Sequence, residues 1–289
     1  MGVSALLAVT MTFGASASLD LRFAEVAPPR PETSSWVRTL GARRAVVLIH
    51  GLKVHVFRDR APYQAKFDGW QEAGSRLVKG LAPLGDVYAA AYSQNTPIED
   101  IAADPRWLSC VANLRDLGYS EIVLVGHSAG GIIARELVED HPTCGCTKIV
   151  QVCAPNAGSW WANLYPAVVQ GEMLFTRSLT KAERQHVLED RADRHIPSEV
   201  EFVCIVGNLE VYGDGMVACS CQWPPDLQSQ GVPARLVATA HPLAVRSAAG
   251  IAEIIQAVRE RSPRWTAAQV AQARKRMLQK TEQSGAPAR

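Results

Sequence analysis

Short apolar runs recur along the chain, and stretches with helical spacing separate them. The runs lie at 19–26, 45–49, 87–92, 122–125, 148–152, 200–206 and 236–239. From Ile251 to Val258, apolar residues recur at intervals of three and four, which is the stripe of a helix facing a core. Several runs are apolar throughout, as strands buried on both faces require. The alternation predicts an α/β fold with a mostly parallel central sheet and helices on both faces.

The run at 122–125 leads into a G-x-S-x-G sequence at 126–130, and a predicted helix follows at 132–139. A serine becomes an effective nucleophile when a sharp strand-to-helix turn exposes its hydroxyl, and such a turn tolerates only small neighbours. The five residues alone would also fit an ordinary glycine-rich turn. Because a strand precedes them and a helix follows, we predict that Ser128 is a nucleophile.

A serine nucleophile needs a base, and a histidine at the carboxyl edge of the sheet would serve. The chain has seven histidines. His241 follows the last apolar run and precedes helical sequence, a position that places an imidazole over the sheet edge. The other histidines lie inside glycine motifs, beside prolines or in polar segments. We therefore predict that His241 is the general base.

An acid that orients this histidine should follow the preceding strand. Asp214 lies between two glycines after the run at 200–206, where a tight turn can direct a carboxylate inward. Glu210 lies nearer to the strand and is the alternative, and a solvated loop aspartate is the third interpretation. We predict Asp214 as the acid.

The negative oxygen that forms during acyl transfer needs N–H donors. Gly51 follows the run at 45–49 and lets the backbone turn without a clashing Cβ, which leaves the next N–H free. We predict that the oxyanion hole consists of the N–H groups of Leu52 and Ala129. A plain glycine turn after a strand is the alternative at 50–52.

The order nucleophile, acid, base resembles that of the α/β-hydrolases, and within them bacterial lipases and esterases. The resemblance covers about residues 45–258, and it is carried by His50-Gly51, the serine motif at 126–130, Asp214-Gly215-Met216-Val217 and His241. It implies the α/β-hydrolase fold and a serine carboxylic-ester hydrolase that acts through an acyl-serine on a small-molecule or lipid ester. It implies no cofactor and no metal. Acyltransferases and thioesterases share these motifs and remain alternatives.

The resemblance also divides the chain. Asn156-Ala157-Gly158-Ser159 is similar to the lipase segment after the sixth strand of that fold, so residues 157–199 would form a lid-like insertion in a hydrolase domain at 19–262. An apolar stretch opens this insertion, and Trp160, Trp161 and Leu164 are its candidates for substrate binding. The same stretch could instead be the buried side of a packing helix.

Composition narrows the function classes further. Hydrophobic residues make up 47% of the chain, charged residues 20%, and the net charge is +2. No basic stripe is interleaved with aromatic residues, so we expect no nucleic-acid partner. A basic tail at 263–289 begins with a possible capping box at Thr266 and Gln269. It is interpreted most simply as a solvated helix, and contact with an anionic lipid surface is the alternative.

Two features bear on where the protein resides. Residues 1–18 carry no charged side chain and contain a small-residue sequence, Ala15-Ser16-Ala17, as secretory signals do. They also lack an early Lys or Arg, so an export segment and a cytoplasmic location both remain open.

Seven cysteines include two C-x-C pairs, at 144–146 and 219–221, for which disulfides, unpaired thiols or a zinc site are the alternatives. Cys153 and Cys204 are interpreted as small buried hydrophobic residues.

Overall fold

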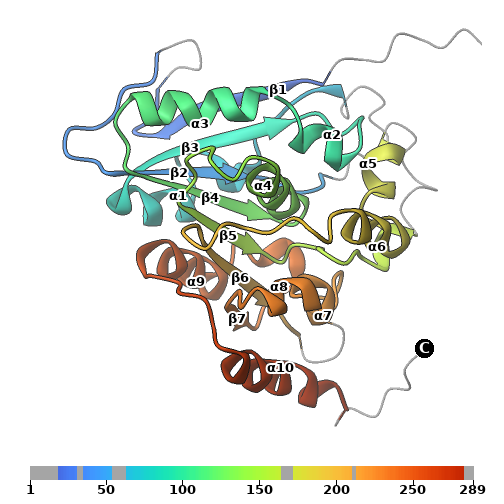
Figure 1. Cartoon of the computed structure of the whole chain (residues 1–289). Helices are drawn as coiled ribbons and strands as arrows, with labels where there is room; N and C mark the ends of the chain where they lie inside the picture. Colours follow the sequence, from blue (N-terminus) through green and yellow to red (C-terminus); the bar gives the residue numbers. More distant parts are fainter. Residues whose placement is uncertain (1–18, 31–34, 54–62, 164–171, 210–212, 283–289) are drawn as a thin grey trace, which may run out of the picture.

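The computed structural model describes residues 19–30, 35–53, 63–163, 172–209 and 213–282. Within these residues, seven strands form one central sheet (Figure 1). They are β1 (Leu21–Ala27), β2 (Arg44–Ile49), β3 (Asp86–Tyr92), β4 (Glu121–His127), β5 (Lys148–Val152), β6 (Glu201–Gly207) and β7 (Ala234–Val237). Their order is β1-β3-β2-β4-β5-β6-β7, and β1 alone is antiparallel to its neighbour. The predicted mostly parallel α/β sheet is confirmed.

Helices cover both faces of the sheet, as predicted (Figure 1). One face carries α2 (Ile98–Ala102), α3 (Arg106–Asp116), α4 (Ala129–Asp140), α7 (Cys219–Gln222), α8 (Pro225–Ser229) and α10 (Ala267–Glu282), and the other carries α1 (Arg76–Leu81) and α9 (Ala248–Arg259). Successive residues of a strand point to opposite faces, so Val47 packs in the first core and Val46 in the second. This two-sided burial explains why the central strands are apolar throughout.

The sequence predicts one helix from Trp70 to Lys79, and the structure differs there. A single 3-10 turn, η2 (Gly69–Gln71), comes first, and α1 begins only at Arg76. The side-chain amide of Gln71 donates hydrogen bonds to the carbonyls of Leu48 and Ala90, at 2.9 Å each, which ties the turn to two strands. Ser75 then caps α1 by accepting a hydrogen bond from the N–H of Val78. Tertiary contacts therefore override the helical spacing.

Helix α6 (Lys181–Asp190) belongs to the segment that the sequence suggests is a lid, together with α5 (Met173–Arg177). Arg184 of α6 is 1% exposed, and its guanidinium bonds to Glu136 of α4 at 3.0 Å and to Glu99 of α2 at 2.8 Å. Breaking a buried ion pair costs about 3–5 kcal/mol, because the remaining charge is left without a partner. The second half of the proposed insertion is thus anchored to the helix that follows Ser128. The lid interpretation of the whole segment stays a prediction, and residues 164–171 lie outside the described part.

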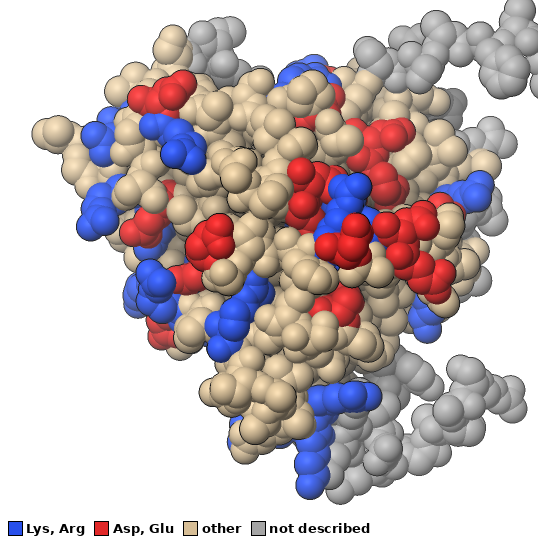
Figure 2. All heavy atoms as spheres, viewed as in Figure 1, with Lys and Arg blue, Asp and Glu red and all other residues tan. Residues whose placement is uncertain are grey.

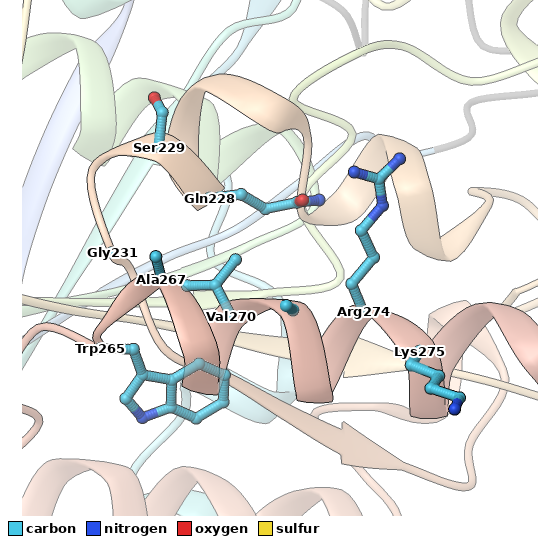
Figure 3. A pocket seen from close by; sticks show the side chains of 9 residues that line it. Gln228, Ser229, Gly231, Trp265, Ala267, Val270, Arg274 and Lys275 are labelled. Carbon is cyan, nitrogen blue, oxygen red and sulfur yellow. The ribbon is translucent and has the colours of Figure 1, made fainter.

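Helix α10 begins with the predicted capping box. The Thr266 N–H donates to the side chain of Gln269 at 2.9 Å, and the Gln269 N–H donates to the Thr266 hydroxyl at 3.3 Å. One face of the helix packs on the core through Val270, Ala273 and Met277. A hollow of about 550 Å³ separates it from α8, with Val270 and Ala267 directed toward that helix (Figure 3). The tail helix is therefore solvated on one side and docked on the other.

Charges of both signs are mixed over the face of the molecule shown in Figure 2. Acidic and basic side chains lie next to one another there. Ion pairs hold some of the charges of the molecule together, such as those of Arg191 with Glu139 and Asp140. Among the residues that the structure describes, no helix combines the length and apolar character needed to cross a membrane.

Candidate active site

Ser128 lies at the point where β4 ends and α4 begins. Its backbone has φ 54° and ψ −127°, a conformation that side-chain-bearing residues rarely adopt. The turn closes only because its neighbours lack side chains. A Cβ on Gly126 would lie 2.3 Å from the carbonyl oxygen of Gly130, and a Cβ on Gly51 would lie 2.4 Å from the Cβ of Ser128. The glycines that the sequence analysis singled out are thus steric requirements of this turn.

The structure brings Ser128, Asp214 and His241 together, although 113 residues separate the serine from the histidine. The Nε2 atom of His241 lies 2.9 Å from Oγ of Ser128, and its Nδ1 atom lies 2.6 Å from Oδ2 of Asp214. A carboxylate only accepts, so Nδ1 carries the proton that it donates to Asp214. Nε2 is then free to accept a hydrogen bond from the Ser128 hydroxyl.

Asp214 is held by the tight turn in which it lies. Its Oδ1 atom accepts hydrogen bonds from the N–H groups of Met216 at 3.0 Å and Val217 at 2.7 Å. Its own backbone carbonyl accepts from the N–H of His241 at 2.9 Å. Both carboxylate oxygens and the backbone therefore fix the position of the Asp214 side chain relative to the imidazole. Glu210, the alternative acid, lies outside the described residues.

Cys153 is a part of the site that the sequence analysis missed, because it treated this residue as a small buried hydrophobe. The residue follows β5 with φ 53° and is fully buried. Its sulfur, an Asp214 carboxylate oxygen and a ring nitrogen of His241 all lie within 4.8 Å of one another. Burial and the neighbouring carboxylate raise the pKa of the thiol well above its usual value, so the thiol stays neutral. The sequence position of Cys153 could have indicated this, because a residue directly after β5 lies at the same sheet edge as Ser128, which directly follows β4.

These three groups are also the one set of three or more potential metal ligands that converges in the described residues. Asp214 and His241 already share a hydrogen bond at 2.6 Å, which a bound metal ion would have to replace. The thiols of the two C-x-C pairs do not converge into such a set, so the zinc alternative has no support. All seven cysteines are unpaired in the structure.

The predicted oxyanion donors flank Ser128. Leu52 lines the cavity in front of the serine, and Ala129 is the first residue of α4. Among the described residues, we find no acceptor for the backbone N–H of either one. The N-terminus of a helix carries partial positive charge, and here it lies beside the serine hydroxyl. The role of these two N–H groups as the oxyanion hole stays a prediction.

A cavity of about 140 Å³ opens in front of Ser128 and His241. Its apolar lining residues are Leu52, Pro155, Trp161, Ala162, Leu179, Met216, Val217 and Pro242, and its charged residues are Asp68 and Arg246, which form an ion pair. Of the predicted substrate-binding residues, Trp161 lines this cavity. Trp160 does not line it and is 44% exposed, and Leu164 lies outside the described residues.

His127 packs beside the candidate base. Its Nε2–H donates to the backbone carbonyl of His241 at 3.0 Å, and its ring lies edge-on to Trp70. Burial, followed by repulsion from His241, lowers the pKa of His127 to about 3. His127 is therefore neutral in the folded protein at any pH near 7, and it anchors the backbone of His241.

Comparison with known proteins agrees with this architecture. No protein-family model matches the sequence, and neither does any curated protein. Among solved structures, the mature form of lipase BlEst2 from Bacillus licheniformis is similar, with a TM-score of 0.57 and 14% sequence identity over 85% of this chain and 99% of that chain. Phospholipase PlaB from Legionella pneumophila is similar over 84% of this chain and 64% of that chain, with a TM-score of 0.54 and 13% identity. This likeness confirms the α/β-hydrolase fold that the sequence motifs imply.

Acidification should remove a stabilising contribution of His127. The unfolded chain protonates a histidine near pH 6.5 and the folded protein only near pH 3, so the unfolded state binds more protons between these values. Stability therefore falls as pH falls through this window, by up to about 1.4 kcal/mol per pH unit. The variant His127→Gln retains an N–H donor but does not titrate at this position, so it lacks this pH-dependent loss of stability. The stability difference between wild type and variant, measured by urea unfolding from pH 7 to pH 4, should shift steadily in favour of the variant.

The exposed His186 provides a matched control, because His186→Gln changes a histidine whose side chain is 68% exposed. Its stability difference from wild type should change little over the same pH range. A pH-independent difference for His127→Gln would contradict a neutral, buried His127.

Proposed function

We propose that this protein hydrolyses carboxylic esters through an acyl-serine, with Ser128 as nucleophile, His241 as general base and Asp214 as the acid that orients the base. The observation that supports this most strongly is the continuous pair of hydrogen bonds from Ser128 to His241, at 2.9 Å, and from His241 to Asp214, at 2.6 Å. The hydroxyl at one end of this chain faces a cavity, while the carboxylate at the other end is fully buried. This arrangement matches what nucleophilic catalysis by serine requires.

Acylation would begin with attack of Ser128 Oγ on the ester carbonyl while His241 Nε2 takes the hydroxyl proton. The imidazolium formed in this step is stabilised by the Asp214 carboxylate on Nδ1. His241 then donates its proton to the departing alkoxide, and the alcohol leaves. In the second half, His241 activates a water molecule that attacks the acyl-serine, and Ser128 is regenerated with release of the carboxylic acid.

The negative oxygen of each tetrahedral intermediate would be held by the N–H groups of Leu52 and Ala129. One such donor typically contributes about 2.7–4 kcal/mol to lowering the barrier. Gly51 permits this arrangement, because any side chain at that position would collide with Ser128. The strained backbone of Ser128 directs its Oγ atom toward the cavity and places the following N–H at the start of α4.

The cavity favours a short acyl or alcohol group. Its volume is about 140 Å³, and its apolar side is formed in part by Trp161, Leu179 and Val217. Ligand sites of drug size measure about 300–1,000 Å³, so this cavity is small by comparison.

Acyl transfer and thioester hydrolysis would use the same residues with a different acceptor or leaving group, and a comparison of oxygen esters with thioesters separates these activities.

Removing the nucleophile or the acid should stop turnover while leaving the fold intact. With a series of p-nitrophenyl esters, Ser128→Ala should lower kcat by about 10⁴-fold or more, and Asp214→Asn should lower it by up to about 10⁴-fold, because an amide cannot stabilise the imidazolium. Glu210→Gln is the matched control and should be nearly silent. A crippled Glu210→Gln enzyme with an active Asp214→Asn enzyme would move the acid to residue 210, and full activity of folded Ser128→Ala would contradict the mechanism.

Neighbouring tryptophans test the substrate cavity. Trp161 lines the cavity, whereas Trp160 is 44% exposed and does not, so Trp161→Ala should shift the chain-length preference toward longer esters and Trp160→Ala should not. Initial rates over the p-nitrophenyl ester series give the preference, and thermal midpoints report any loss of packing. If Trp161→Ala lowers stability but leaves the preference unchanged, Trp161 is structural and does not contact the substrate.

A further inference from the structure

The two C-x-C pairs have different backbone conformations, so the two thiols can approach each other in one pair and not in the other. Cys144 and Cys146 lie in the loop between α4 and β5, with Gly145 in a left-handed turn at φ 101°. This turn brings the side chains of Cys144 and Cys146 close enough to interact directly. Cys219 and Cys221 lie on the short helix α7, where residues two apart do not face each other. The Cys219 thiol instead points to the carbonyl of Gly207, at 3.8 Å.

The surroundings of the 144–146 loop favour a reactive thiol at one position. Cys144 is half-buried, and Cys146 is buried in the core. The side chain of Arg115 from α3 lies against the loop, since a Cβ on Gly145 would be 2.5 Å from its Nη1 atom. Hydrogen bonding from Cys146 and from backbone N–H groups of the loop, with a smaller contribution from the positive charge of Arg115, lowers the pKa of Cys144 to about 7 against the opposite effect of burial. A cysteine that lies near a cation is partly deprotonated at neutral pH, and the thiolate is the reactive form of a cysteine side chain.

We propose that Cys144 and Cys146 form a redox-active dithiol that a small-molecule disulfide converts into an intramolecular disulfide. The Cys144 thiolate attacks one sulfur of the reagent, which forms a mixed disulfide and expels one thiolate. Cys146 then attacks the sulfur of Cys144 while its proton passes to the leaving sulfur, and the second thiol of the reagent is released. The two protein thiols are oxidised, and the reagent is reduced to two thiols.

The short loop argues for a reversible bond. A disulfide stabilises a protein mainly by restricting the unfolded chain, and this effect grows with the number of residues in the closed loop. A bridge between residues 144 and 146 encloses one residue, so it contributes little to stability and is readily reduced again. The loop precedes β5, whereas Ser128 follows β4, so the thiols lie at the opposite edge of a parallel sheet from the candidate active site. The proposal is therefore independent of the proposed hydrolase function.

Oxidised glutathione is a suitable probe with the full-length, freshly reduced protein. After incubation, free thiols are alkylated and the protein is mapped by mass spectrometry. We expect loss of two alkylatable thiols, a bridge between Cys144 and Cys146, and recovery of both thiols with a dithiol reductant. The rate should rise with pH around 7, as the Cys144 thiolate forms.

Single variants separate the two steps. Cys146→Ser should stop at a stable glutathione adduct on Cys144, whereas Cys144→Ser should prevent oxidation of Cys146. Cys219→Ser and Cys221→Ser are the matched controls and should react like wild type, and Arg115→Leu should react several-fold more slowly at pH 7. Circular dichroism shows that each variant is folded. A mixed disulfide that persists on Cys144 in the wild type, or a first reaction at Cys219 or Cys221, would overturn the proposal.

Discussion

The positive φ of Ser128 is the constraint on which the rest of the site depends. A strained backbone of this kind costs on the order of 1–3 kcal/mol and persists only where its surroundings hold it. Here the Ser128 N–H donates to the carbonyl of Val152 on the neighbouring strand at 2.9 Å, and the Ser128 carbonyl accepts from Gly131 at 2.9 Å. Gly51 and Gly126 leave room for the turn. The sheet and α4 thus impose the conformation that places the hydroxyl at the cavity.

The parallel sheet explains how residues far apart in the chain reach this hydroxyl. Segments that follow β2, β4, β5, β6 and β7 all emerge at one edge of the sheet. Gly51 and Leu52 follow β2, Cys153 follows β5, and Asp214 lies beyond β6. Two backbone hydrogen bonds then fix His241, the candidate base: its N–H donates to the Asp214 carbonyl, and its carbonyl accepts from the neutral His127. The position of the imidazole is therefore set by the backbone as well as by its side-chain partners.

Much of this arrangement could be predicted from the sequence, because buried parallel strands and glycine turns leave strong local signals. The strands and the helix after Ser128 are examples, and so is the convergence of Ser128, Asp214 and His241. Prediction failed where tertiary contacts decide the outcome. The helical spacing from Trp70 to Lys79 is interrupted by the contacts of Gln71 with two strands. Trp161 lines the cavity and Trp160 does not, and the sequence alone does not reveal which of two adjacent side chains points that way. Cys153 was missed because its apolar neighbours conceal its place at the sheet edge.

The central claim is that the hydrogen bonds from Ser128 to Asp214 make one serine nucleophilic. A p-nitrophenyl phosphonate tests this directly, because a serine that it modifies retains a stable adduct that peptide mass spectrometry can locate. We expect a single adduct on Ser128 in the folded protein, much slower labelling in Asp214→Asn, and none in protein unfolded by urea. An adduct on another residue, or no adduct on folded wild-type protein, would contradict the account.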